Sequence, residues 1–438
     1  MNILKHSIAG LVALAALSTS KADTVIHITG STAFRGAATA AIENIMGGAG
    51  NFKAAYAGTS GGEGAATYSV IQGSVASVPA AGVVTVKCTW TGSTGGIKTV
   101  VQNIPVQQTT APNGWMSITN LPGTNTVLPV AAPTYILDTG TFPAETQLAD
   151  VTMEDSAQAS TGFTTTALTE TRVGVIAFEW VANNGSPAAL NNITPLLAQA
   201  LLSGGMPLFQ FTSNIADGTA VYAMGRDFDS GTRLSELAES GVGVFGGVQQ
   251  VQPTISGTAG AAGSSITILK LWPAATVLGQ PFPIGQSGFA SGGTLADNLA
   301  TPGSPTAATP GGADGVLFGP GHLIGYLGRN DAARACKTTS IAGNTAHRLK
   351  WNGVADWNEP ILANGNPTSF NDAAIQNGTY TAWEYESLAY RSTYSGNGKA
   401  VADKIANNII TTSATVSGII LSSMNVSRAV EGGAVTSL

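Results

Sequence analysis

The hydrophobic and polar positions of the chain predict repeated strand–loop–helix units. Residues 25–28 favour a strand, Gly30 and Ser31 turn the chain, and residues 35–46 carry apolar side chains at helical spacing. Residues 220–241 repeat the same order of strand, polar loop and amphipathic helix. Units of this kind predict an α/β protein with parallel sheets.

Other stretches extend this pattern. The run at 173–181 is almost wholly apolar, which predicts a buried strand of a parallel sheet. Residues 67–75 and 82–90 predict the two strands of a hairpin. Residues 193–205 predict a helix closed by glycines, and residues 398–410 a late helix.

Three regions have weak periodicity or interrupt the units, and we expect insertions there. They are rich in glycine, proline or threonine, which favours turns and β-structure. These insertions lie near 104–148, 244–275 and 291–316, the last as a loop, and the family resemblance given below implies a fourth near 47–88.

The first 22 residues have the pattern of a signal peptide. Lys5 and His6 precede a short apolar core, and small residues follow it, so we expect cleavage after Ala22. The apolar core is too short to span a bilayer, and no later stretch is long and apolar enough. We therefore expect an exported protein, periplasmic or secreted.

Charge and cysteine content narrow the possible functions. The chain has 19 basic and 25 acidic residues, a formal charge of −6, and no basic stripe, which argues against a nucleic-acid partner. Cys88 and Cys336 are the only cysteines; an export route permits a disulfide between them, and two buried thiols are the alternative. The histidines are scattered, so we expect no metal site and no cofactor.

Three polar segments stand where helices are expected to begin. They carry Ser31 and Thr32, Ser93 and Thr94, and Ser230 with Gly231 and Thr232. A helix N-terminus offers free backbone N–H groups and a positive dipole end, and small residues let an anion approach it. Each segment alone could be an ordinary helix cap. The prediction of an anion site therefore depends on the presence of three such segments in one α/β chain.

Arg226 stands four residues before Ser230 and could offer a planar guanidinium to a tetrahedral oxyanion. The alternative is a surface ion pair with a neighbouring aspartate. We expect Asp227 or Asp229 to hold the guanidinium. Arg233 and Glu236 are expected on the solvated face of the helix that follows.

Two enzyme motifs are excluded by the sequence. "GSTGGIKT" approaches the nucleotide-binding P-loop, but Ile97 stands where that pattern requires glycine. The chain also lacks the G-x-S-x-G nucleophile elbow. With no nucleophile–base pair or metal cluster evident, we expect a binding protein and not an enzyme such as a phosphatase.

The order of "GSTAF", "GSTGGIK", "ADVTMEDS", "RDFDSGTR", "LIGYLG" and "IQNGTYTAWEY" resembles the phosphate-binding proteins of bacterial phosphate ABC transporters. The resemblance spans both ends of the chain but not the insertions. It implies a periplasmic-binding-protein fold, in which two α/β domains enclose a ligand cleft. It also implies inorganic phosphate, or a similar oxyanion, as ligand and a membrane ABC permease as partner.

The resemblance also implies the ligand contacts. The motifs place them at Ser31, Thr32, Phe34, Ser93, Thr94, Asp155, Arg226, Ser230, Gly231 and Thr232. Arg35 and Gly36 depart from the family pattern, which leaves the register of Ser31 and Thr32 open. Residues 56–64 are a rival for the second loop. Glu154 is a weaker candidate than Asp155, because strand alternation turns it to the other face.

The acidic contact has a physical purpose. Phosphate near neutral pH still carries a proton that a buried carboxylate such as Asp155 can accept, whereas sulfate has none and would be repelled. A cap for the next helix is the alternative role for Asp155.

By the connectivity of the family, residues 23–172 and 379–438 form the first domain and residues 173–378 the second. The chain would cross between them near Val173–Val181 and return near Gly378–Glu386. Closure around the anion would be a hinge motion. An alternative to transport is a surface or matrix protein on the same scaffold, which the insertions and the Gly/Thr-rich composition motivate.

Overall fold

The structure is a computed structural model, and it describes residues 23–58, 62–106, 113–130, 144–277, 280–303, 321–338, 341–362 and 367–438. The expected signal peptide and its cleavage site lie outside these residues. Within them, no helix is both long and apolar enough to cross a membrane.

One mixed sheet runs through the whole molecule, and its strand order is β11-β12-β17-β9-β21-β8-β1-β4-β3-β2-β6, with β18 on β9 and β10 on β18. Its strands are β1 (Thr24–Gly30), β2 (Phe52–Ala57), β3 (Tyr68–Ser74), β4 (Val83–Thr89), β6 (Val127–Pro129), β8 (Val151–Glu154), β9 (Leu168–Ala182), β10 (Asn192–Ile193), β11 (Met206–Pro207), β12 (Ala220–Met224), β17 (Gly321–Gly328), β18 (His347–Trp351) and β21 (Trp383–Arg391).

The helices are α1 (Arg35–Ile45), α2 (Ser93–Gln102), α3 (Pro195–Leu202), α4 (Phe209–Thr212), α5 (Gly231–Glu239), α6 (Gly292–Ala300), α7 (Arg329–Ala335), α8 (Asp372–Gln376) and α9 (Gly396–Thr411). Two-stranded sheets join β5 (Trp115–Met116) to β7 (Ala144–Glu145), β13 (Val251–Ser256) to β14 (Ser265–Leu271), β15 (Ala275–Val277) to β16 (Gln280–Phe282), β19 (Trp357–Ile361) to β20 (Pro367–Phe370), and β22 (Val426–Ser427) to β23 (Thr436–Ser437). The expected α/β class is confirmed.

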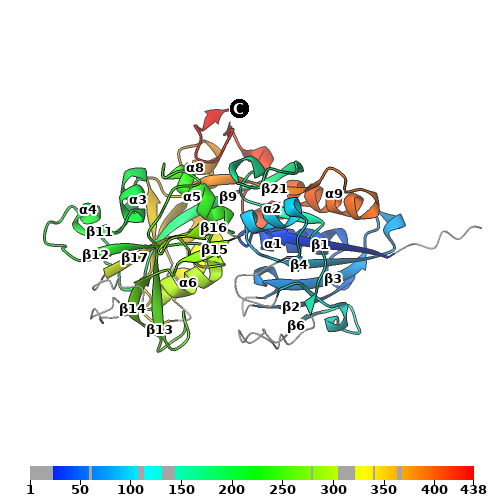
Figure 1. The fold of residues 1–438 in the computed structure, drawn as a ribbon, viewed down its shortest axis with the longest axis horizontal. Coiled ribbons are helices and arrows are strands. Elements are labelled where there is room, and N and C mark those ends of the chain that lie inside the picture. The colour runs from blue at the N-terminus through cyan, green and yellow to red at the C-terminus, as the bar shows by residue number, and fades with distance from the viewer. Residues whose placement is uncertain are drawn as a thin grey trace, which may run out of the picture.

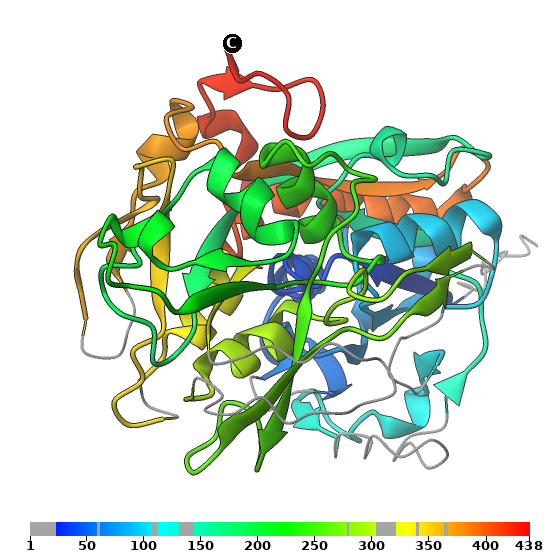
Figure 2. The same cartoon turned by 60° about the vertical axis from the view of Figure 1, so that its left-hand side comes forward.

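The molecule has two lobes, seen on the right and left of Figure 1. The first lobe contains β1–β4, β6, β8, α1, α2 and α9. The second contains β10–β12, β17, β18 and α3–α7. The long strands β9 and β21 pair antiparallel between the lobes and so join them. Figure 2, turned by 60°, shows the β13–β14 hairpin projecting below α6.

In the first lobe, the two faces of the sheet carry different helices. Ile26, Ile28 and Val151 share a buried cluster with apolar side chains of α1 and α9. Strand alternation turns Thr152 to the opposite face, where α2 lies. Cys88 belongs to the cluster of the α1 and α9 face.

In the second lobe, α3 packs with Trp180 and Val221 on one face. Helices α6 and α7 and the β13–β14 hairpin pack with Val181 and Leu323 on the other. Cys336 belongs to this second face, so the two cysteines lie in different cores. Both thiols are free and buried, and burial raises the pKa of each to about 12.

Two predictions from the sequence pattern are wrong. The apolar run at 173–181 is a buried strand, but β9 pairs antiparallel with β17, β18 and β21. The run is apolar because both faces of the strand are buried. Such burial occurs in antiparallel as well as parallel pairing. Within the loop expected at 291–316, residues 292–300 form α6, capped by Ser291, which accepts the N–H of Thr294. Residues 304–320 lie outside the description.

The expected insertion at 47–88 contains strands of the main sheet. The hairpin expected from residues 67–75 and 82–90 is confirmed, since β3 and β4 pair antiparallel. Strand β4 also pairs in parallel with β1, so this segment contributes to the centre of the first lobe. The 244–275 segment supplies the β13–β14 hairpin, which pairs separately from the main sheet.

Gly96 sets how closely α2 approaches the sheet. A Cβ at this position would lie 2.3 Å from Thr152 Oγ1 and 2.7 Å from Gly30 Cα. We therefore expect Gly96→Ala to lower the free energy of unfolding by about 1–3 kcal/mol through overpacking, although alanine favours helices. Denaturant unfolding measures this. Gly123→Ala, whose Cβ would meet nothing within 4 Å, is the control and should be nearly neutral; equal stability of both variants would contradict the close packing.

Candidate functional site

Three loops at the carboxyl ends of strands meet between the lobes. The loop after β1 leads into α1, the loop after β4 into α2, and the loop after β12 into α5. These loops carry the three Ser/Thr segments singled out in the sequence. Two contacts join them across the interface: the N–H of Gly95 donates to Asp229 O at 3.0 Å, and Arg226 Nη2 donates to Thr32 Oγ1 at 3.3 Å.

Asp155 follows β8 and lies at the centre of this meeting point, 1% exposed. Its backbone N–H donates to Ser93 Oγ at 2.6 Å, and Thr232 Oγ1 donates to its Oδ2 at 3.2 Å. Its Oδ1 has no partner among the residues described. The Thr94 hydroxyl at the start of α2 is likewise buried without a described partner. The site thus holds a buried acceptor and a buried hydroxyl for which the described residues supply no partner.

The charge state of Asp155 reflects opposing influences. Burial raises its pKa above the ordinary range, and the Ser93 hydroxyl and the Arg226 guanidinium act to lower it. Since Arg226 belongs to the second lobe and Asp155 to the first, a cation of one lobe influences a carboxyl of the other.

Arg226 is 1% exposed, and main-chain groups hold it in place. Its Nε donates to Phe289 O at 3.0 Å and its Nη2 to Ala290 O at 2.9 Å. Its own N–H donates to Tyr326 Oη at 3.2 Å, and its carbonyl accepts from Gln250. These main-chain contacts therefore fix the position of the guanidinium.

The loop that starts α5 is shaped to approach Asp155. Ser230 caps the helix by accepting the N–H of Arg233 at 3.2 Å. A Cβ on Gly231 would lie 1.8 Å from Asp155 Oδ1, so only glycine fits there. The backbone N–H groups of the first turn of α5 are thereby brought up to the carboxyl.

The residues of the first loop, between β1 and α1, have different roles. Thr32 meets Arg226, as described above. Ser31 Oγ accepts the N–H of Phe34 at 3.3 Å, so this hydroxyl caps the turn before α1. The Phe34 ring is fully buried in the core of the first lobe. The structure therefore brings Thr32 to the meeting point and places the Phe34 side chain away from it.

Of the two segments considered for the second loop, "GSTGGIK" supplies Ser93 and Thr94 at the meeting point. The rival segment at 56–64 lies partly outside the described residues. Its Gly64 borders a separate cavity between the lobes, beside Gly36. Glu154 is fully buried, with both carboxyl oxygens lacking a partner in the described part of the chain, and burial raises its pKa well above the usual range.

Lys98 is a contact that the sequence did not single out as part of the site. It stands one turn into α2, and its Nζ forms an ion pair with Asp229 Oδ1 at 2.6 Å. Since α2 belongs to the first lobe and Asp229 to the second, the pair joins the lobes beside Asp155. The only sequence signal for Lys98 as a site residue was its position four residues after Thr94, which places the two on the same side of a helix.

Three expectations for the stretch 226–236 are wrong. Arg226 is held by carbonyl groups and not by Asp227 or Asp229. Arg233 is 5% exposed, and its Nη1 donates to Arg226 O at 2.9 Å and to Gln286 O at 2.7 Å. Glu236 is fully buried. Helix α5 has no solvated face here because it packs against both the sheet and the first lobe.

Comparisons with known proteins give similarity at the level of solved structures. No family model and no curated protein matches the chain. An ABC-type phosphate transport receptor from Vibrio cholerae is 10% identical, with 90% of this chain and 99% of the receptor covered and a TM-score of 0.43. A protein from Clostridium perfringens, described as a candidate phosphate ABC transporter substrate-binding protein with bound phosphate, is 11% identical, with 91% and 100% covered and a TM-score of 0.44.

A phosphate-binding protein from Stenotrophomonas maltophilia is 13% identical over 89% of this chain and 84% of its own, with a TM-score of 0.35. These proteins are of the class that the sequence motifs resemble. All three TM-scores lie below 0.5.

Glu236 gives a pH-dependent stability. Burial, followed by the neighbouring Glu239, raises its pKa from 4.5 to about 8. The unfolded carboxyl releases its proton near its ordinary pKa while the folded one retains it, so this residue costs stability increasingly as the pH rises through that window. We expect Glu236→Gln to unfold at a higher temperature near pH 8 and to show a flatter dependence between about pH 5 and 8.

Thermal unfolding across this pH range measures the effect. The exposed Glu359→Gln is the matched control and should follow the parent protein. A Glu236→Gln variant with the same pH slope as the parent would contradict the burial of a neutral carboxyl.

Proposed function

We propose that this protein is an exported solute-binding protein that captures inorganic phosphate, or a similar tetrahedral oxyanion, between its lobes and delivers it to an ABC permease. The proposed ligand contacts are Thr32, Ser93, Thr94, Asp155, Arg226, Ser230, Gly231 and Thr232. Ser31 stabilises the first loop by accepting the N–H of Phe34. The Phe34 ring anchors this loop in the core of the first lobe. The gathered groups are hydroxyls, N–H groups, one carboxyl and one guanidinium, a set suited to binding.

The observation that carries the proposal is Asp155 Oδ1, a buried acceptor without a described partner, facing helix N-termini and a fixed guanidinium. Such surroundings favour an anion. A buried carboxyl among them favours an anion that brings its own proton. Hydrogen phosphate meets both conditions, and sulfate meets only the first.

The lobe arrangement supports capture. Asp155 and Ser93 come from the first lobe, whereas Arg226 and Thr232 come from the second. A ligand bound to all four holds the lobes together, and the Lys98–Asp229 ion pair closes the interface beside it. Release then requires the lobes to part, as in hinge closure.

Calorimetric titration with phosphate, arsenate and sulfate tests the proposal. We expect heat with phosphate and a much weaker response to sulfate. Arg226→Ala should weaken phosphate binding by at least about a hundredfold, because it removes the buried cation that the anion would pair with. Lys270→Ala, an exposed cation on β14, should bind as the parent does. The absence of phosphate binding by the parent protein would refute the proposal.

Asp155→Asn tests the origin of specificity. The amide cannot accept the phosphate proton as a carboxylate does, but it no longer repels sulfate. We expect the ratio of phosphate to sulfate affinity to fall by about tenfold or more. The exposed Asp403→Asn should leave the ratio unchanged. An unaltered ratio in Asp155→Asn would reduce Asp155 to a structural residue.

A further inference from the structure

A cavity lies between the lobes, next to the proposed oxyanion site. This cavity has a volume of about 640 Å³, a size that suits small-molecule ligands. It is lined by the start of α1, by α7, by the turn of the β13–β14 hairpin and by part of α6. Thr32 connects the cavity to the proposed oxyanion site, because it lines the cavity and its Oγ1 accepts from the Arg226 guanidinium.

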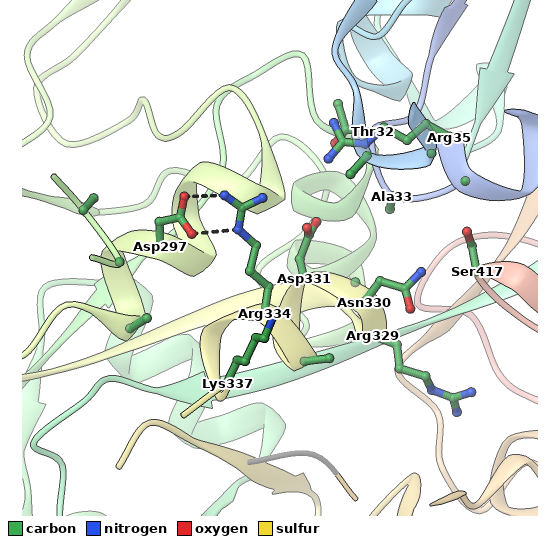
Figure 3. A pocket seen from close by; sticks show the side chains of 18 of the residues that line it. Thr32, Ala33, Arg35, Asp297, Arg329, Asn330, Asp331, Arg334, Lys337 and Ser417 are labelled. Carbon is green, nitrogen blue, oxygen red and sulfur yellow. Dashed lines mark hydrogen bonds and ion pairs between the residues drawn. The ribbon is translucent and has the colours of Figure 1, made fainter. Parts of the chain in front are cut away.

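Arg35 is the notable side chain of this cavity. It is 7% exposed, and none of the described residues accepts a hydrogen bond from its guanidinium or pairs with it within 4 Å. Burial lowers its pKa, which is the mark of a cation without full compensation. Figure 3 shows the side chain of Arg35 extending from α1 into the cavity beside Thr32.

The other charged groups of the cavity are arranged around Arg35. Arg334 forms a two-bond pair with Asp297, at 2.7 and 2.6 Å, and Lys337 stands on the rim. Arg329 turns away, toward Asp356 and Asp372. The cavity therefore keeps a cationic lining of which only part is neutralised.

Asp331 is the acidic group that faces Arg35. It comes from α7 in the second lobe and lies 9% exposed. A Cβ on Gly292 would lie 2.1 Å from its Oδ2 and 3.4 Å from Arg226 Nη1, so this carboxyl stands between the two arginines. Burial raises its pKa, and Arg35 and Arg226 act to lower it. An ion pair of Arg35 with Asp331, made on lobe closure alone, is the competing account.

The character of the lining limits what the cavity can hold. Its walls are charged residues, threonine, serine, asparagine, alanine and glycine, and the lining residues include no aromatic ring. A nucleobase would find no stacking surface there, whereas a compact hydrophilic anion would find donors.

We infer that Arg35 forms a second anion subsite beside the Arg226 site, so that the protein binds compact ligands with two anionic groups, of which diphosphate is the simplest. The inference rests on the proposed function, since one phosphoryl group occupies the Arg226 site. The second group extends past Thr32 into the cavity and pairs with the Arg35 guanidinium, where the N–H donors form charge-assisted hydrogen bonds.

Calorimetric titration with inorganic phosphate and inorganic diphosphate tests the subsite in the full mature chain. We expect the parent protein to bind diphosphate at least about tenfold more tightly than phosphate. Arg35→Gln should remove this advantage and leave phosphate affinity within about twofold, and Arg35→Lys should restore part of it. Circular dichroism and thermal unfolding check that the variants fold.

Several results would overturn the inference. One is diphosphate binding no more tightly than phosphate, and another is an advantage that survives Arg35→Gln. Equal weakening of both ligands by Arg35→Gln would place Arg35 in a single oxyanion site. If diphosphate affinity is unchanged in Arg35→Gln while unfolding shifts, Arg35 and Asp331 form only a closure pair.

Arg226→Ala separates this inference from the proposed function. Loss of both ligands in that variant, with loss of only the diphosphate advantage in Arg35→Gln, supports both statements. Phosphate binding that is indifferent to Arg226→Ala refutes the proposed oxyanion site, and with it the inference. Phosphate binding that depends on Arg226, without any preference for diphosphate in the parent, refutes the subsite alone.

Discussion

The arrangement between the lobes depends on one electrostatic constraint: a carboxyl and a guanidinium, one from each lobe, are buried in the same interface. Asp155 and Arg226 are each 1% exposed, and they do not pair directly within 4 Å. Burying two charges without direct pairing costs free energy unless other groups compensate. Carbonyl groups satisfy part of Arg226, and hydroxyls satisfy part of Asp155, but Oδ1 is left over. In the function that we propose, a bridging anion with a proton would complete both groups and would couple ligand binding to lobe closure.

The fold brings these groups together through strand ends and small residues. β9 and β21 run between the lobes, so each lobe presents the carboxyl ends of its parallel strands to the shared interface. Close approach then requires residues without side chains. Gly92 and Gly231 stand where a Cβ would strike Asp229 O and Asp155 Oδ1. The sequence pattern indicated that these glycines belong to anion-binding loops. They also allow the two lobes to approach each other closely.

The sequence predicted local features better than tertiary ones. Cap residues and helical spacing placed the starts of α1, α2 and α5, because these signals are local. The partners of Arg226 could not be predicted, since Phe289 O and Ala290 O are main-chain groups more than sixty residues away. The burial of Glu236 was missed for the same reason. The sequence pattern showed a polar face on α5, but Arg233 on that face donates to main-chain carbonyl groups of its own lobe, and Glu236 is buried near Glu239 and Glu384. Antiparallel pairing of β9 was missed because burial on both faces yields the same apolar run in either orientation.

Charge along the interface alternates in a way that limits the ligand. Asp155, Arg226, Asp331 and Arg35 influence one another in that order, with each carboxyl next to a guanidinium. A cation entering the interface would meet two buried guanidinium groups, and an uncharged solute would bring no counter-charge to them. In the binding mode that we infer, a single small oxyanion would compensate Arg226 alone, because the Arg35 side chain lines the neighbouring cavity. An elongated dianion would compensate both arginines at once and would pass Thr32, which lines the cavity and contacts Arg226.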